Sequence, residues 1–302
     1  MHNSIFNASF EESKNIVSKD ILTRDGAGMG DSSSMRLRDR IILFLLFIFF
    51  FGILFYMIGV EMPISMGKSK PEDIFLISYE SAQLIAKIGS ILKPFVLFSL
   101  VFFLLSLTIN LAPKKNYAHQ LFVGSLILVG MTLCLFSSTS SLILGLTIDG
   151  VGWVGLVFQI ILCAIWITYL VYDRRCFFLK QLRGEQIESK NWSKSISKFF
   201  KKYSGVFVLF IILNRWFFHL GEGEIGNPSL LGLLYGWAFL LVVGFLSFVF
   251  NLISPQFLSN FYFIKYGEQY KEYFEITDEQ WYGKRKAKRL EKRRKKENQN
   301  DK

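Results

Sequence analysis

The chain contains long apolar blocks that carry no charged side chain, and residues 41–60 form the clearest of them. A bilayer core of ~30 Å is crossed by about 20 apolar residues in a helix, so this block alone is long enough to span a membrane. Similar blocks follow along the chain, and the charged residues, 20% of the total, lie mainly between and after them. This arrangement excludes an intrinsically disordered chain, a soluble enzyme domain and a disulfide scaffold, and it predicts a polytopic membrane protein.

The blocks predict an all-α integral membrane protein, a polytopic bundle of about six transmembrane helices accompanied by amphipathic interfacial helices. The predicted spans lie near residues 41–60, 94–112, 121–148, 151–172, 206–220 and 230–253. The third block would be about 42 Å long as a single helix. Two alternatives therefore stay open for it: one long tilted helix, or a helix broken at Ser137–Ser141. The fifth block is short, and we include it because it keeps the two strongly basic segments on one side.

Basic residues predict the orientation of the bundle, since positively charged loops stay in the cytoplasm. Arg36, Arg38 and Arg40 directly precede the first span, and residues 173–203 hold nine Lys and Arg. Both termini are therefore expected in the cytoplasm of a multi-pass cell-membrane protein, and the abundance of Phe, Ile, Lys and Asn suggests a bacterial source. The expected organisation is a flexible N-terminal segment (1–40), a membrane domain (41–253) and a basic tail (254–302).

Three stretches outside the spans have amphipathic patterns. Residues 192–203 place aromatic and basic side chains on different faces of a helix, which is typical of a helix on an anionic leaflet or packed on its own bundle. Residues 77–91 carry an apolar stripe that predicts a helix covering the outer mouth of the bundle or docking a partner. Pro94 is expected to separate that helix from the second span. In the tail, Thr277 and Gln280 have the spacing of a capping box at the start of a helix.

The end of the tail is strongly basic, with ten Lys and Arg against one Glu in residues 284–296. Such a run after a last span is typical of a topology determinant that contacts the anionic inner leaflet. The alternative is a binding partner, an acidic protein or a nucleic acid. Nucleic acid is the less favoured because the run lacks interleaved aromatic residues. The candidate contact residues are Lys284, Arg285, Lys286, Lys288, Arg289, Lys292, Arg293, Arg294, Lys295 and Lys296.

Motifs for catalysis, nucleotide binding and metal binding are missing from the sequence. It has no GxxxxGK[ST] loop, HExxH helix or GxSxG elbow. Its three His are far apart, and its three Cys have neither disulfide nor metal spacing. We expect no catalytic residue, cofactor or metal, and nothing supports an enzyme.

Polar residues inside or beside a span are the default candidates for a functional site in a membrane protein. Arg215 lies in the fifth block between Asn214 and His219, and Asp149 lies in the predicted turn between the third and fourth spans. We hypothesise that Arg215 pairs with Asp149, and that Asn214 and His219 complete a polar pocket open to the exterior. Gln159, in the fourth span, is a candidate for an interhelical hydrogen bond.

Two classes of function fit these features. The first is a non-enzymatic membrane protein that acts through protein partners, such as an immunity or accessory factor for a toxin or a secretion system. The second is a transporter or permease subunit with a polar site near Arg215 and Ser137–Ser141. The expected partners are the lipid bilayer with its anionic inner leaflet and, in the first class, a toxin or secretion component.

Overall fold

The structure, a computed structural model, describes residues 4–22, 36–74, 77–112, 116–185 and 235–300, together with residues 202, 205 and 209. The described part of the chain is helical and contains no strand. It holds four helices that are long and apolar enough to cross a membrane. The prediction of a helical membrane protein is confirmed, whereas the six spans and the orientation of the termini stay predictions. The predicted fifth span and the amphipathic stretch 192–203 fall outside these ranges, except for the three isolated residues.

The first membrane helix runs from Leu37 to Lys68 without interruption. It consists of α2 (Leu37–Leu46), η3 (Phe47–Gly52), α3 (Ile53–Tyr56), η4 (Met57–Glu61) and α4 (Met62–Lys68), in which η3 and η4 are π-helical turns. Apolar side chains point outward along most of it, and Phe49 is 67% exposed. Exposed apolar side chains of this kind are suited to contact with lipid.

The second helix, α5 (Tyr79–Leu111), differs from the prediction. It joins the amphipathic stretch and the second span into one helix of 33 residues with Pro94 inside it. The separate covering helix and the break at Pro94 are therefore wrong. One proline removes a single backbone hydrogen bond, and packing on both sides of it keeps the helix continuous. Ser78 begins α5 as its N-cap, with its hydroxyl accepting from the Ser81 amide at 3.1 Å.

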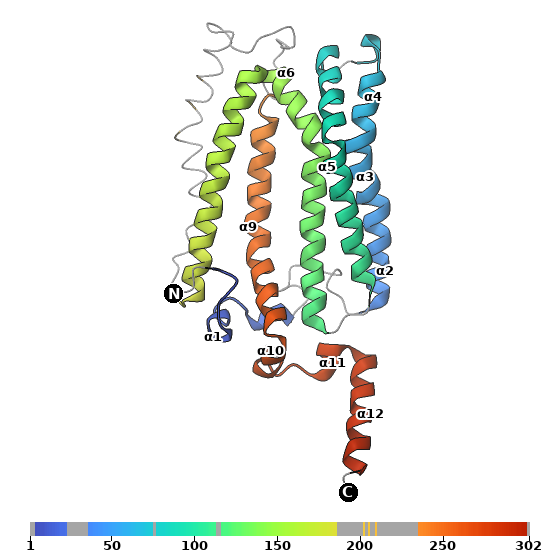
Figure 1. Ribbon diagram of the computed structural model, residues 1–302, viewed down its shortest axis with the longest axis vertical. Coiled ribbons are helices and arrows are strands. Elements are labelled where there is room, and N and C mark those ends of the chain that lie inside the picture. Colours follow the sequence, from blue (N-terminus) through green and yellow to red (C-terminus); the bar gives the residue numbers. More distant parts are fainter. Residues whose placement is uncertain are drawn as a thin grey trace.

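The third and fourth predicted spans lie in α6 (Tyr117–Leu182), which bends at Gly152 into two arms. Figure 1 shows the two arms running in the same direction away from the bend, with α9 between them in this view. The bend comes shortly after the expected Asp149-Gly150 turn, because only Gly152 has the required backbone angles, φ 69° and ψ 176°.

The break proposed at Ser137–Ser141 is absent, and the helix continues through this stretch. Hydroxyls of the stretch donate back to carbonyls one turn earlier, Thr139 to Leu135 at 2.7 Å and Ser140 to Phe136 at 2.6 Å. The Thr139 and Ser140 hydroxyls are thereby satisfied without disrupting the helical ladder. The alternative of one long helix is the correct one.

The last membrane helix, α9 (Ala238–Lys265), continues through Pro255. The helix therefore continues past the predicted boundary at residue 254, and the division into a membrane domain and a basic tail stays a prediction. Three further helices follow: α10 (Gly267–Tyr273), α11 (Asp278–Tyr282) and α12 (Lys284–Asn300). The predicted capping box is confirmed, with Thr277 as the N-cap of α11 and Gln280 as its partner.

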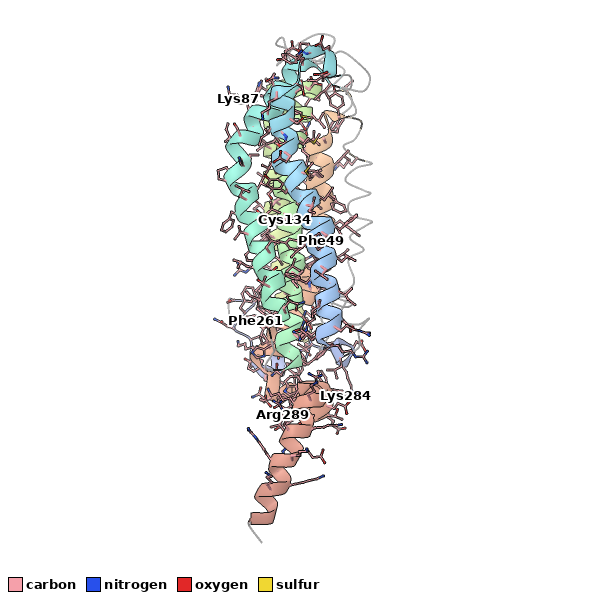
Figure 2. All side chains as sticks on the ribbon, turned by 90° about the vertical axis from the view of Figure 1, so that its right-hand side faces the viewer. Phe49, Lys87, Cys134, Phe261, Lys284 and Arg289 are labelled. Atoms are coloured by element: carbon pink, nitrogen blue, oxygen red, sulfur yellow. The ribbon has the colours of Figure 1, made fainter. Side chains whose placement is uncertain are left out.

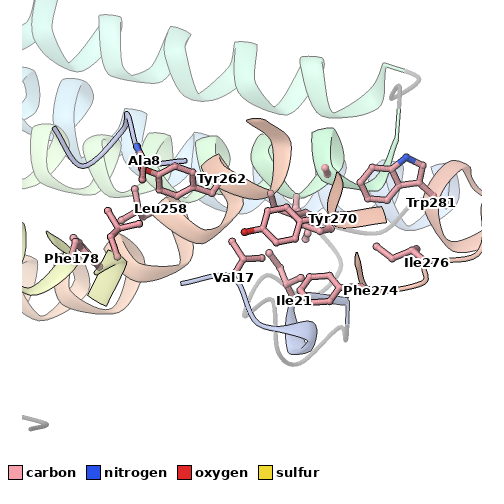
Figure 3. Close-up of a cluster of buried hydrophobic side chains, with 14 residues drawn as sticks. Ala8, Val17, Ile21, Phe178, Leu258, Tyr262, Tyr270, Phe274, Ile276 and Trp281 are labelled. Atoms are coloured by element: carbon pink, nitrogen blue, oxygen red, sulfur yellow. The ribbon is translucent and has the colours of Figure 1, made fainter. Parts of the chain in front are cut away.

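The N-terminal segment is folded rather than flexible over residues 4–22. It forms α1 (Phe10–Ser13) and η1 (Lys19–Leu22) and buries Ala8, Val17 and Ile21. These side chains join a cluster with the end of α9, α10 and α11, in which Tyr262, Tyr270 and Trp281 are fully buried (Figure 3). We call this assembly of residues 4–22, the end of α9, α10 and α11 the terminal platform. Figure 1 places it at one end of the bundle, with α12 extending beyond it.

Arg40 lies on α2 and is only 6% exposed. Its guanidinium donates to the carbonyls of Asn110 and Ala112, at 2.7 and 3.0 Å, and it also contacts Gln120. The last carbonyls of a helix have no partner of their own, so a cation at this position is favourable. Arg40 therefore caps α5, a role beyond the orientation signal that the sequence assigns to it.

Candidate functional site

Asp149 is a buried carboxylate on α6 close to its bend, with 1% of its surface exposed. Three hydroxyl groups in the described part of the chain donate to it. Ser78 donates to Oδ1 at 3.0 Å, Ser81 donates to the same oxygen, and Tyr235 donates to Oδ2. A buried carboxylate without donors would be strongly destabilising, so these hydroxyls account for its presence inside the protein.

The donors come from two parts of the chain that are far from Asp149 in sequence. Ser78 and Ser81 stand at the start of α5, where Ser78 also caps the helix. Tyr235 lies just before α9. Asp149 therefore connects the start of α5, the bend of α6 and the approach to α9, at the end of the bundle opposite the terminal platform (Figure 1).

The predicted ion pair of Asp149 with Arg215 stays a prediction. Arg215, Asn214 and His219 lie outside the described residues, and among those that are described no ion pair involves Asp149. Sequence reasoning selected Asp149 but missed Ser78, Ser81 and Tyr235. An N-cap serine before an amphipathic helix is detectable in sequence, whereas nothing in sequence relates Tyr235 to Asp149.

Small residues pack the helices closely below Asp149. A Cβ added at Gly145 would lie 2.1 Å from Ile85 Cγ1, and one added at Gly89 would lie 2.3 Å from Pro63 Cβ. Distances this short leave no room for a side chain, so α4, α5 and α6 meet with their backbones close together. The Asp149 site therefore lies next to a part of the bundle in which α4, α5 and α6 are tightly packed.

The Ser137–Ser141 stretch is not part of this site. About three helical turns, roughly 16 Å, separate Ser138 from Asp149 along α6. Ser138 instead lies against Gly59 of η4, where an added Cβ would be 2.8 Å from Ser138 Cα. The Ser138 and Ser141 hydroxyls are buried and have no hydrogen-bond partner among the described residues.

Gln159 forms the interhelical hydrogen bond predicted for it. Its Nε2 donates to the carbonyl of Gly236 at 2.8 Å and joins the second arm of α6 to the approach to α9. Close by in sequence, the Phe239 amide donates to Thr147 Oγ1 at 3.2 Å. These two bonds fix the segment that carries Tyr235 and so help to position its hydroxyl.

The terminal platform is held by hydrogen bonds as well as by apolar packing. The Ala8 amide donates to the Tyr262 hydroxyl at 3.2 Å, and the hydroxyls of Ser13 and Tyr270 are 2.7 Å apart. Burial raises the pKa of Tyr270 to about 12, and the Ser13 hydrogen bond acts in the opposite direction. Residues more than 250 positions apart are thereby fixed against each other.

Asp278, the first residue of α11, forms ion pairs with two helices. Lys271 of α10 lies 2.6 Å from Oδ1, and Arg294 of α12 lies 2.8 Å from Oδ2. The hydrogen bond from Lys271 is the main reason that the pKa of Asp278 lies below its usual value, and Arg294 adds to the effect. The carboxylate thus holds α12 to the platform.

The second candidate site is the surface of α12 itself. All ten predicted contact residues of α12 are exposed. Figure 2 shows Lys284 and Arg289 at the end of the bundle, beyond Phe261. Among the described residues, no group of three His, Cys, Asp or Glu side chains is placed to hold a metal ion.

The comparisons with known proteins add no functional information. Neither protein-family models, nor curated proteins, nor solved structures give a match for this chain. Its function is therefore argued from the two sites described above.

Proposed function

We propose that the chain is a membrane protein that acts without catalysis, through a protein partner bound at the platform end of the bundle, as immunity and accessory factors for a toxin or a secretion system do. The observation that carries this proposal is the exposed basic helix α12, which is anchored to a folded base by the Asp278 ion pairs. A run of charge that served orientation alone would need no such anchoring.

The proposal also requires an anchor in the membrane, and the membrane helices have the surface of one. Exposed apolar side chains lie along the first helix, α5, the second arm of α6 and α9, for example Phe49, Phe98, Ile165 and Leu241. A belt of this kind holds the bundle in lipid and leaves the platform end beside the membrane surface. A partner bound to α12 would in that way be kept at the membrane.

The test is a charge-removal variant of α12, Arg285→Gln, Lys288→Gln, Arg289→Gln and Lys292→Gln together. Glutamine has a helix propensity close to that of lysine and arginine, so α12 should stay helical. The matched control removes four lysines near the opposite end, with Lys68→Gln, Lys70→Gln, Lys87→Gln and Lys93→Gln.

The readout is the phenotype of a strain that lacks the chain, challenged with the product of its neighbouring genes and scored for membrane potential and survival. Wild type and the control should restore the phenotype, and the α12 variant should not, although it reaches the membrane in equal amount. Restoration by the α12 variant would contradict the proposal, as would a strain without the chain that shows no change.

Transport is a second candidate, favoured by the buried Asp149 carboxylate, which only hydroxyl groups contact among the described residues. A carboxylate at such a position is a candidate carrier of protons or cations. The test is proton flux into liposomes that contain the protein and a pH-sensitive dye. Flux that is present in wild type and lost in Asp149→Asn would support transport, and equal traces with and without protein would argue against it.

A further inference from the structure

We propose that α12 binds the phosphate backbone of a nucleic acid, an inference that goes beyond the protein partner of the proposed function. The two sides of this helix differ. Ala287 and Leu290 are half-buried, and Arg294 reaches Asp278 of α11. These three residues fall on one side of a helix with 100° between residues, so this side faces the platform.

The other side of α12 is basic over a wide arc. At 100° per residue, the Lys and Arg side chains from Lys284 to Lys296 other than Arg294 cover roughly 200° of the helix circumference. All of them are exposed. Glu291, the one acidic residue in this run, lies at the edge of the arc and pairs with Lys295 at 2.6 Å. The arc is therefore a continuous cationic surface with no apolar residue in it.

The direction of α12 argues against the membrane as its partner. The helix leaves the platform along the long axis of the bundle, pointing away from the apolar belt (Figures 1 and 2). Its 17 residues extend about 25 Å. The screening length at physiological salt is about 8 Å, so the outer turns lie beyond the electrostatic reach of the leaflet. The only apolar residues of the exposed turns, Ala287 and Leu290, face the platform and are not available for insertion.

The orientation of α12 is set by its first turn and by Asp278. Gly283 has a φ of 79°, and its carbonyl accepts from the Ala287 amide at 3.0 Å. Lys284 lies 3.4 Å from Glu279, and Arg294 is held three turns further on. A helix fixed at both points presents its basic arc without the entropy cost of ordering a flexible tail.

The width of the arc fits a groove lined by phosphates better than a flat acidic surface. A plane can be met by only part of a 200° arc, whereas the major groove of a DNA duplex, about 12 Å wide, admits an α-helix between two rows of phosphates. Arginine and lysine are the residues that bind phosphate oxygens. Contacts to phosphate carry no sequence information, whereas an arginine of the arc that reaches guanine O6 and N7 would add a preference for guanine.

The test measures binding of fluorescein-labelled 20-base-pair DNA and RNA duplexes to the full chain in phosphatidylcholine nanodiscs. Fluorescence anisotropy is recorded for wild type, for the four-residue α12 variant and for the four-lysine control defined above. Wild type and the control should bind the DNA duplex, and they should bind the RNA duplex more weakly, because the major groove of A-form RNA is deep and narrow. If about five phosphates are contacted, affinity should fall roughly 500-fold between 50 and 200 mM salt. The α12 variant should lose at least about tenfold in affinity at 50 mM salt and show a flatter salt dependence.

Three results would overturn the proposal. The first is equal affinity of wild type and the α12 variant for the duplexes. The second is stronger competition per charge by polyglutamate, which points to an acidic protein. The third is stronger competition by phosphatidylglycerol vesicles, which points to the leaflet. If duplex binding is absent and the α12 variant still loses the cellular phenotype, this inference fails and the proposed function stands. If duplex binding depends on α12 and the phenotype does not, the proposed function fails instead.

Discussion

The Tyr235 hydroxyl donates a hydrogen bond to the Asp149 carboxylate across 86 positions of sequence. This contact joins the approach to α9 to the bend of α6, and Ser78 and Ser81 at the start of α5 donate to the same carboxylate. Because Asp149 accepts from both neighbouring segments, the loss of one donor should loosen the end of the bundle as a whole.

Tyr235→Phe should lower the free energy of unfolding by about 1.5–3 kcal/mol, since a hydrogen bond to a charged acceptor is removed while the carboxylate stays buried. The measurement is the thermal unfolding midpoint in detergent. Tyr169→Phe is the matched control, because Tyr169 is an exposed tyrosine on α6. An unchanged midpoint in Tyr235→Phe would show that this donor is dispensable.

Gly152→Ala should destabilise the α6 hairpin by about 1–3 kcal/mol, because φ 69° with ψ 176° is a backbone conformation essentially restricted to glycine. Gly244→Ala is the control. Gly244 lies within α9 with open space around it, so an added methyl group should be neutral or stabilising by up to about 1 kcal/mol. Both variants are compared by thermal unfolding. Equal midpoints for the two would contradict the assigned role of Gly152.

Asp278 should make the docking of α12 sensitive to acid. Its pKa is lowered in the folded protein by Lys271 and Arg294. The folded state therefore binds this proton less tightly than the unfolded state does. The stabilisation is present above the unfolded pKa of ~3.9 and is lost as pH falls through the lower, folded value.

The measurement for Asp278 is the distance between spin labels at exposed positions of α10 and α12, followed from pH 7 downward. Docking should be lost at low pH in wild type, whereas Asp278→Asn should be loosened already at pH 7. Glu268→Gln removes a different exposed carboxylate from α10 and serves as the control. A wild-type distance that is independent of pH would contradict the role of this ion pair.

Tyr270 should give the terminal platform an alkaline limit. Its pKa is raised to about 12 by burial. The folded state therefore holds the phenolic proton more tightly, so the stabilisation is complete below the unfolded pKa of ~10 and is lost as pH rises toward 12. The measurement is tyrosinate absorbance as pH rises. The number of tyrosines that lose their proton only at high pH should be one lower in Tyr270→Phe than in wild type. Tyr273→Phe, an exposed neighbour, is the comparison. Identical titrations of the two variants would count against a buried Tyr270.

The sequence predicts the helical membrane class because uncharged blocks such as residues 41–60 can fold stably only as helices in lipid. It does not predict how those helices continue beyond the lipid. Pro94 resembles a helix boundary, yet α5 runs through it, since packing against other segments outweighs one lost hydrogen bond. The Ser137–Ser141 stretch resembles a helix break because hydroxyl side chains compete for backbone hydrogen bonds, yet Thr139 and Ser140 donate to carbonyls of the same helix.

The hydrogen-bond partners of Asp149 cannot be predicted from the sequence, for a different reason. The sequence indicates Asp149 as a counter-charge for Arg215, but its donors depend on how α5 and the approach to α9 meet at the α6 bend. Residues 1–40 are predicted to be flexible because they are polar and contain Gly- and Ser-rich stretches. The burial of residues 4–22 depends on contacts with residues much later in the sequence, in α6 and in the segment from α9 to α11.

The terminal platform also has a consequence for the order of folding during synthesis. Residues 4–22 are translated before Tyr262 and Tyr270, against which they pack, and these two tyrosines lie near the end of α9 and in α10. The contacts of residues 4–22 with the two tyrosines therefore form only once α9 has been synthesised. A complete terminal platform therefore indicates that α9 has been synthesised. In a product truncated before α9, residues 4–22 would lack these contacts and would be exposed to proteases.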